Sequence, residues 1–195
     1  MVVGTRKQQA ERTEAELKAA AVRVFARVGY LNTKITDITA EAGRATGSFY
    51  KHFTGKEKLL EALLADMLAE GDARAELPEH PTDFRDRAAV RWHVELYWGF
   101  YRENRAVMSA LQQAAIVDEE FARRSREMLE PDLQHIAGHL AGLELPGDPM
   151  TAASLFTTTL SGAVAGWFEE SEAGRDDETA RIEALTTFLH RGMGG

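Results

Sequence analysis

The sequence predicts an all-α protein with about nine helices. Apolar residues recur at the helical spacings i, i+4, i+7 and i+8, as in the stripe formed by Leu17, Ala21, Val24, Phe25 and Val28. Residues that favour helices are abundant, and only five prolines interrupt the 195 residues. Four of these prolines fall in two short stretches, 77–81 and 145–149, which mark the clearest breaks between helices.

The N-terminal part predicts three helices in close succession. Residues 1–9 are expected to be a tail, and a first helix runs from there to Gly29, which ends it. Between Ile35 and Phe53 apolar residues keep a near-helical spacing that Gly43 interrupts, so two short helices joined by a turn are predicted. This is the plan of a helix-turn-helix, whose second helix enters a major groove of DNA.

The ends of these two short helices carry few capping side chains. Ala45 offers no side-chain cap, so the second helix begins there or at Thr46, which could take the cap itself, and ends near His52. Thr33 stands just before the first short helix, where its hydroxyl could cap it.

The remainder of the chain predicts a larger helical domain. Further helices are expected over residues 82–104, 105–116, 118–143, 149–170 and 179–190. We therefore expect a DNA-binding domain in residues 1–55 and a second domain in residues 56–195, with residues 56–76 as the connecting helix.

The charge of the chain is distributed unevenly. The net charge is −8, which alone would argue against nucleic acid as a partner. Up to Leu60, however, there are eleven basic and six acidic residues, and all six lysines lie in this segment. The rest carries twelve basic and 25 acidic residues. Such asymmetry indicates a basic module for a polyanion joined to an acidic body.

Several classes of protein are excluded by what the sequence lacks. No run approaches the ~18 apolar residues of a membrane span, and the N-terminus has no apolar signal core. There are no cysteines, and therefore no disulfide bonds and no thiolate metal site. We expect a cytoplasmic protein without a membrane partner.

No motif for catalysis is present. The sequence has neither a phosphate-binding glycine loop nor a nucleophile elbow, so we expect no enzyme and no cofactor. His135 and His139 have the i, i+4 spacing at which two imidazoles can share a metal, but the glutamate of the metalloprotease motif is missing. We interpret them as two surface histidines and expect no metal site.

A specific motif runs through the segment from Leu17 to Leu60. Gly47, Tyr50, Phe53 and Lys56 form the pattern Gly-x-x-Tyr-x-x-Phe-x-x-Lys, in register with Ala42-Gly43 and with an upstream Phe25-x-x-x-Gly29-Tyr30. In these residues the segment resembles the DNA-binding domain of TetR-family (tetracycline-repressor-like) transcriptional regulators. Two positions depart from the family pattern, since Arg44 replaces a usual apolar residue and Ala45 a usual capping serine.

The resemblance implies a homodimer that places two recognition helices in successive major grooves of a palindromic, double-stranded operator. Arg44, Thr46 and Ser48 are expected near base edges. The residues expected near phosphate are Lys34, Tyr50, Lys51, His52 and Lys56, and Thr33 is also expected at the DNA.

The resemblance also implies a small-molecule effector bound by the second domain, where it would release the DNA. We expect a largely apolar pocket and therefore a hydrophobic effector. Its lining is predicted from Trp92, Phe100, Met108, Leu111 and Phe156, with Gln112 as a polar anchor.

The last two predicted helices are expected to form the dimer interface. The helix from Pro149 to about Glu170 is too apolar for a surface helix, and its small residues allow a partner helix to come close. Two helices from each chain would form a four-helix bundle, with contacts from Leu155, Gly162, Ala163, Gly166, Leu185 and Phe188.

The function predicted from these features is that of a ligand-responsive transcriptional repressor. Two alternatives from other classes remain. One is an architectural DNA-binding protein or an activator whose body is filled and binds no effector. The other is a helical enzyme that has acquired this DNA-binding domain, which would require a catalytic constellation that the sequence does not show.

Overall fold

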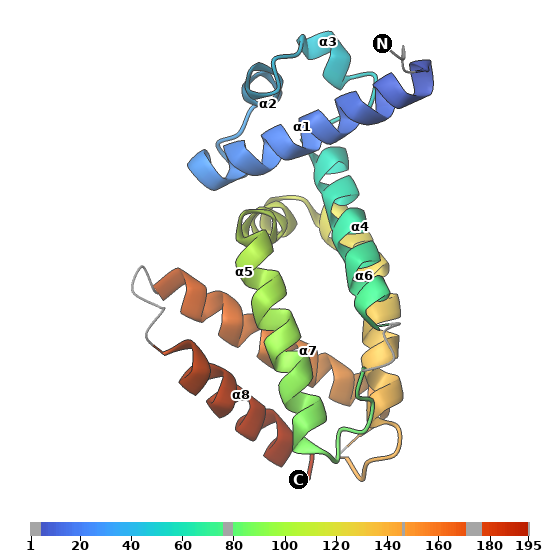
Figure 1. The fold of residues 1–195 in the computed structure, drawn as a ribbon, viewed down its shortest axis with the longest axis vertical. Helices are drawn as coiled ribbons and strands as arrows, with labels where there is room; N and C mark the ends of the chain where they lie inside the picture. Colours follow the sequence, from blue (N-terminus) through green and yellow to red (C-terminus); the bar gives the residue numbers. More distant parts are fainter. Residues whose placement is uncertain (1–4, 76–79, 146, 171–176, 195) are drawn as a thin grey trace. The chain divides into compact units, whose positions relative to one another are not determined.

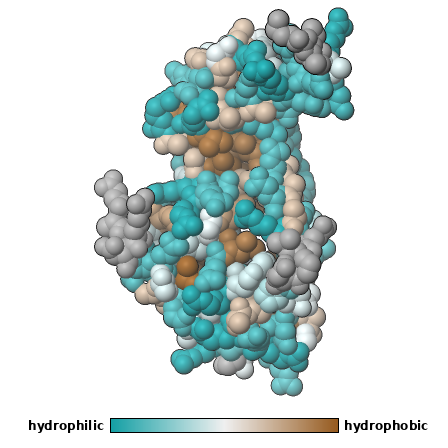
Figure 2. Space-filling model, viewed as in Figure 1, coloured by the Kyte–Doolittle hydropathy of each residue, from teal (hydrophilic) through white to brown (hydrophobic). Residues whose placement is uncertain are grey.

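A computed structural model describes residues 5–75, 80–145, 147–170 and 177–194 of the chain. Eight α-helices lie within these ranges, which confirms the all-α prediction (Figure 1). None of the helices in the described ranges is long and apolar enough to cross a membrane. The face drawn in Figure 2 is mostly hydrophilic, with hydrophobic residues in a few groups.

The chain forms two compact units, and each takes two stretches of sequence. The first unit contains residues 1–72 and 105–127, and the second contains residues 73–104 and 128–195. These units are defined by compactness. The predicted division into a DNA-binding domain up to residue 55 and a second domain after it stays a prediction.

Three helices at the start of the first unit build the predicted helix-turn-helix. Helix α1 (Arg6–Val28) lies across α2 (Ile35–Glu41) and α3 (Thr46–Phe49), which share one side of it (Figure 1). The apolar stripe of α1 predicted from the sequence is buried, with the exception of Val28. It packs with Ile38 of α2 and Phe49 of α3, both fully buried, so the three helices share one core.

Helix α1 begins earlier than the sequence pattern predicted. Thr5 caps the helix, since its hydroxyl accepts a hydrogen bond from the Gln8 N–H and the Gln8 side chain accepts one from the Thr5 N–H. Such a cap stabilises a helix by ~1 kcal/mol. The prediction of a tail over residues 1–9 is therefore wrong from Thr5 onward, and residues 1–4 lie outside the described ranges.

Helix α4 (Lys56–Ala75) begins at the predicted residue. Its apolar face is buried, and two ion pairs hold its outer side. Asp66 accepts from Lys18 of α1 at 2.9 Å, and Glu61 accepts from Arg124 of α6 at 2.5 Å. The helix is thus fastened to both neighbouring segments of the first unit.

Helix α5 (Arg87–Val117) joins two helices that the sequence predicted separately. Asn104 has non-helical angles (φ −109°, ψ 17°), and its side chain donates to the Phe100 carbonyl at 3.0 Å. This residue marks the predicted break between residues 82–104 and 105–116, which the backbone crosses with a kink rather than a loop. The merged helix accounts for eight helices in the described ranges where about nine were expected.

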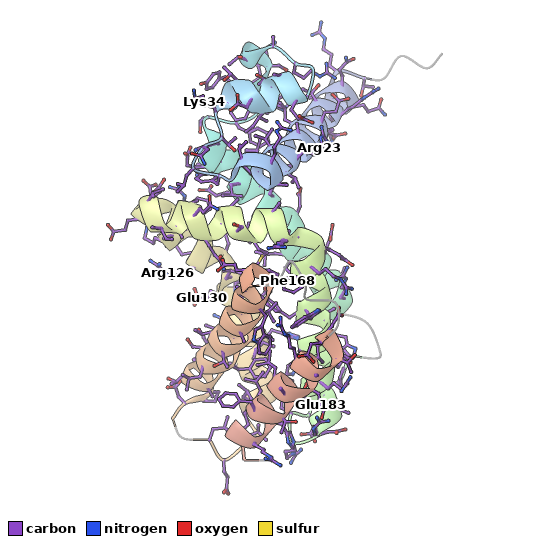
Figure 3. All side chains as sticks on the ribbon, turned by 90° about the vertical axis from the view of Figure 1, so that its left-hand side faces the viewer. Arg23, Lys34, Arg126, Glu130, Phe168 and Glu183 are labelled. Carbon is purple, nitrogen blue, oxygen red and sulfur yellow. The ribbon has the colours of Figure 1, made fainter. Side chains whose placement is uncertain are left out.

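The second unit is a helical layer built around α7 (Pro149–Glu170) and α8 (Glu178–Gly192), which lie side by side (Figure 1). The first part of α5 and the last part of α6 (Glu119–Leu140) complete it. Ion pairs join two of the helices, because Glu183 of α8, labelled in Figure 3, accepts from both Arg87 and Arg91 of α5.

Candidate functional site

The turn between α2 and α3 is held by the backbone. Gly43 has a positive φ of 63°, which a residue with a side chain rarely adopts, and the Arg44 N–H donates to the Thr39 carbonyl at 2.8 Å. Helix α3 starts at Thr46 with Ala45 as its uncapped boundary residue. Thr46 therefore lies inside the helix, so the alternative in which it caps α3 is wrong.

Two basic residues and one aromatic residue are exposed on the helix-turn-helix, namely Lys34, Tyr50 and Lys51. Lys34, labelled in Figure 3, precedes α2, and its N–H donates to the Asp37 carboxylate at 2.9 Å. Tyr50 is 57% exposed, although a tyrosine is usually well covered. An exposed tyrosine on the same motif as two exposed lysines suits contact with a sugar-phosphate backbone.

Thr33 is less available than predicted. Its side chain is 3% exposed, and the hydroxyl donates to the Gly29 carbonyl at 2.7 Å, at the end of α1. The expectation that Thr33 caps α2 is therefore wrong, because that hydroxyl points to the preceding helix. Its contact with DNA remains a prediction.

Arg44 is tied to the first helix. Its Nε donates to Glu16 Oε2 at 3.0 Å, and a second nitrogen of the guanidinium contacts the same oxygen. Arg12 also binds Glu16, at 2.9 Å. The hydrogen bonds from Arg44 and then from Arg12 lower the pKa of Glu16 below its usual value of 4.5. To reach a base edge, as predicted, Arg44 would have to leave this carboxylate.

Lys56 is half-buried at the start of α4 and binds the chain between α1 and α2. Its Nζ donates to the carbonyls of Tyr30, at 2.9 Å, and Thr33, at 3.2 Å, and lies 4.2 Å from the centre of the Tyr30 ring. Burial lowers the pKa of Lys56. An ammonium has three N–H donors, so one remains for the predicted phosphate contact.

Three half-buried residues complete the predicted DNA surface. Thr46 Oγ1 of α3 lies 3.4 Å from the hydroxyl oxygen of Thr39 of α2. His52 Nδ1 lies 3.7 Å from a carboxylate oxygen of Glu14. Ser48 is also half-buried. The three side chains thus sit at the edge of the core.

The sequence reasoning missed Thr36 and Gly47, which are both exposed on the helix-turn-helix. No atom lies within 4 Å of the position that a Cβ on Gly47 would occupy. The absence of a side chain there leaves the α3 backbone open to a close neighbour. Their positions near the start of each short helix were the available signal.

The predicted effector residues divide between the two units. Trp92, Phe100 and Phe156 belong to the second unit, and only Phe156 is fully buried, at 3% exposure. Met108, Leu111 and Gln112 belong to the first, where Gln112 is exposed. Neither the surface hollow along α8 nor the hollow between α1 and α2 contains any of the six. A pocket lined by all of them remains a prediction.

The predicted dimer residues, all in the second unit, differ in their exposure. Leu155 of α7 is 62% exposed and Phe188 of α8 is 67% exposed, and Gly162 is exposed as well. Ala163 and Gly166 are half-buried. Leu185, in contrast, is 4% exposed and packs inside its own chain, and its role as an interface residue stays a prediction.

Four histidines of the second unit gather in one cluster, which we call the histidine cluster: His80, His93, His135 and His139. His80 precedes α5, His93 lies on α5, and the other two lie on α6. The Nε2 atoms of His80 and His93 are 3.0 Å apart, and those of His135 and His139 are 3.1 Å apart. His135 is exposed, as expected of a surface histidine, but the pair does not stand alone, because the His80 ring contacts both imidazoles.

Burial makes two of these imidazoles poor bases. It is the largest cause of a shift that lowers the pKa of His93 to about 4; a hydrogen bond to Ala89 opposes this shift, and the neighbouring histidines add to it. Burial, then His135 and His80, likewise lower the pKa of His139 to about 4. Both side chains are neutral at pH 7, and a neutral imidazole is the form that binds metals.

Comparison with known proteins identifies the family. Residues 17–63 match the model of the tetR family of bacterial regulatory proteins. This N-terminal segment of the chain belongs to the TetR family. The members of this family are transcription regulators and not enzymes. This confirms the expectation that the chain is not an enzyme.

Two relatives from Pseudomonas putida match in sequence. The chain is 28% identical to the transcriptional repressor NicS over 144 residues, which are 73% of this chain and 65% of NicS. It is 37% identical to the regulator TtgR over 79 residues, which are 40% of this chain and 38% of TtgR. The chain thus spans less than two thirds of the length of either relative.

Solved TetR-like structures share the fold over nearly the whole chain. FadR from Bacillus subtilis, solved in complex with stearoyl-CoA, superposes with a TM-score of 0.77 at 20% identity and covers 91% of this chain and 98% of its own. FadR from Bacillus halodurans has a TM-score of 0.72 at 22% identity and covers 96% of each chain. At this identity the likeness shows the fold alone.

Proposed function

We propose that the protein is a cytoplasmic transcriptional repressor that binds a palindromic DNA operator as a homodimer and is released by a small hydrophobic molecule. The observation that carries the proposal is the exposed surface of α2 and α3. On it Lys34, Tyr50 and Lys51 are open to solvent around the bare backbone of Gly47.

The surface divides by chemistry into two kinds of contact. Lys34 and Lys51 are charged and exposed, so they suit phosphate, which gives affinity without sequence preference. Thr46 and Ser48, together with Gly47, lie on the short recognition helix, where side-chain hydroxyls and bare backbone suit base edges. The basic balance of the segment up to Leu60 supports the same assignment.

DNA selected by the full-length protein from a random double-stranded library tests this proposal. We expect an inverted repeat whose half-sites lie about one helical turn apart. Lys51→Ala should weaken binding to all sequences and reduce the slope of log K against log salt by ~0.9. Thr46→Ala should instead change the preferred sequence. The control is Arg126→Ala, which also removes one exposed positive charge. Arg126 lies on α6, outside the helix-turn-helix, and is labelled in Figure 3.

Results that contradict the proposal are equally defined. A library without enrichment would contradict sequence-specific binding. An Arg126→Ala effect as large as that of Lys51→Ala would show that the surface of α2 and α3 has no special part in binding DNA. Placement of the selected site between a promoter and a reporter gene then tests repression. Increased expression in the presence of the protein would favour the activator alternative.

Dimerisation is proposed through the outer faces of α7 and α8. Leu155 and Phe188 are large apolar side chains that are mostly exposed, and the small residue Gly162 lies on the same outer side of α7 as Leu155. The small residues Ala180 and Ala184 adjoin Phe188 in the hollow along α8. A second copy of the chain would cover both apolar side chains and supply the twofold symmetry of a palindromic operator.

The effector is proposed to be hydrophobic because aromatic side chains are concentrated in the second unit. FadR of Bacillus subtilis was solved with stearoyl-CoA, so a long-chain acyl-CoA is the first compound to screen. Quenching of tryptophan emission together with release of the operator would support the proposal. Release only by small, highly charged solutes would contradict it, and no release by any compound in a diverse set would favour an architectural protein.

A further inference from the structure

The histidine cluster brings together donor atoms from segments that are distant in sequence. The chain has six histidines, and four of them lie in this cluster. One ring nitrogen from each of His80, His93 and His139 lies within 4.8 Å of the other two. All three residues belong to the second unit, so their arrangement does not depend on how the two units are placed.

We propose that His80, His93 and His139 bind a divalent transition-metal ion of the Zn²⁺ type, with the fourth coordination place open to water or a further donor. Bonds of ~2.0–2.1 Å in a tetrahedral site separate the ligand atoms by about 3.4 Å. The Nε2 atoms of His80 and His93 are 3.0 Å apart, which is slightly less than this value. The ring nitrogens of all three residues lie within 4.8 Å of one another, a limit slightly above it. Small side-chain rotations therefore suffice to complete the site.

His93 is already oriented as a metal ligand would be. Its side chain is 7% exposed, and its Nδ1 lies 2.9 Å from the Ala89 carbonyl, to which it donates. This contact fixes the tautomer, because an Nδ1 that carries the proton leaves the lone pair on Nε2, which faces His80. Metal-binding histidines are commonly oriented by such a hydrogen bond from the second ring nitrogen.

The surroundings of the cluster are aromatic and apolar. The Trp92 ring stacks on His80 at 5.0 Å, and the Phe84 ring meets His93 at 4.7 Å and His139 at 5.2 Å. Among the three proposed ligands, His93 is buried, while His80 and His139 are half-buried. His135, whose Nε2 lies 3.1 Å from that of His139, is the nearest further imidazole.

The donor set decides which class of ion fits. All three proposed ligands are imidazoles, which suit Zn²⁺, Ni²⁺, Co²⁺ and Cu²⁺. Ca²⁺ and Mg²⁺ require oxygen ligands and are therefore not expected to bind here. The alternative is a packed cluster of histidines and aromatic rings that binds no ion. The two readings differ in what added Zn²⁺ does to the protein.

Calorimetric titration of tag-free, full-length protein with Zn²⁺ tests the proposal. We expect one ion per chain. Loss of a residue that only hydrogen-bonds to a metal ligand lowers metal affinity roughly 10- to 100-fold. His80→Ala and His139→Ala each remove a proposed ligand and should therefore lower the affinity for Zn²⁺ by more than this. His190→Ala is the matched control, because His190 lies on α8 and contacts the Arg85 carbonyl at 3.0 Å outside the cluster. It should bind Zn²⁺ as the original chain does.

Two further measurements keep the test decisive. Far-UV circular dichroism checks that each variant is folded, and His80 lies outside any helix, so its replacement removes no helical residue. Co²⁺ should give the intense visible absorption of a four-coordinate site and quench Trp92 emission. The proposal would be overturned if the original chain failed to bind Zn²⁺. It would also be overturned if His80→Ala and His139→Ala bound Zn²⁺ as tightly as the original chain. Neither result involves DNA, so the proposed repressor function is tested separately.

Discussion

Replacement of Lys56 with alanine tests how the start of α4 is fastened to the helix-turn-helix. The Lys56 ammonium donates to the Tyr30 carbonyl at 2.9 Å and to the Thr33 carbonyl at 3.2 Å. It also lies 4.2 Å from the centre of the Tyr30 ring. These contacts connect the segment between α1 and α2 to α4, and the alanine variant removes all of them together.

The expected loss of stability follows from these contacts. A hydrogen bond with a charged partner contributes ~1.5–3 kcal/mol, and a cation–π contact at an exposed site ~0.5–1 kcal/mol. Solvent screens a half-buried ammonium, and burial, which lowers the pKa of Lys56, opposes the gain. We therefore expect Lys56→Ala to lower the free energy of unfolding by ~2 kcal/mol, or the Tm by about 4–8 °C.

Urea unfolding followed by circular dichroism measures the effect. The control is Lys58→Ala, which removes a surface ion pair with Glu61 at 2.7 Å and should cost ~1 kcal/mol or less. If Lys56→Ala unfolds at the same urea concentration as this control, the carbonyl contacts contribute nothing. The third N–H of Lys56 is expected to bind phosphate, so the salt slope of DNA binding should fall by ~0.9. An unchanged slope would rule out that contact.

Three further changes are predicted. Gly47→Ala should remain folded, because no atom lies within 4 Å of the new Cβ, yet weaken operator binding; unchanged affinity would place DNA elsewhere. Phe188→Lys should convert dimers to monomers in sedimentation, and a monomeric original chain would contradict the interface. Because Arg44 and Arg12 lower the pKa of Glu16 below 4.5, its carboxylate stabilises the fold above that pH and less as the pH falls through the lowered pKa. Glu16→Gln should therefore lose less stability on acidification, as urea unfolding at several pH values would reveal.

Helix boundaries with a local cause were predictable from the sequence. The starts of α4 at Lys56 and of α7 at Pro149 agree with the sequence pattern, as does the break at Asn104. The start of α1 was also readable, since Thr5-x-x-Gln8 is the spacing of a capping box. The apolar pattern over the first nine residues is weak, so helical periodicity alone predicts a tail there.

The candidate site was predictable only in part. The resemblance led to the helix-turn-helix and its residues, and Lys34, Tyr50 and Lys51 are exposed there. It did not reveal that Arg44 is bound by Glu16 or that Thr33 is buried. Both facts depend on how α1 packs on the turn, and a motif within α2 and α3 contains no information about that partner.

The sequence by itself determined the all-α class, the helix-turn-helix and the family, because helical periodicity, turn glycines and a contiguous motif are properties of neighbouring residues. Only the tertiary structure decided which polar groups meet. Lys56 reaches carbonyls 26 and 23 residues away, and Arg44 binds a carboxylate 28 residues away. His80 and His93, 13 residues apart, join His135 and His139 of another helix. Contacts of this range are set by the packing of apolar faces, which brings polar groups together that no local pattern relates.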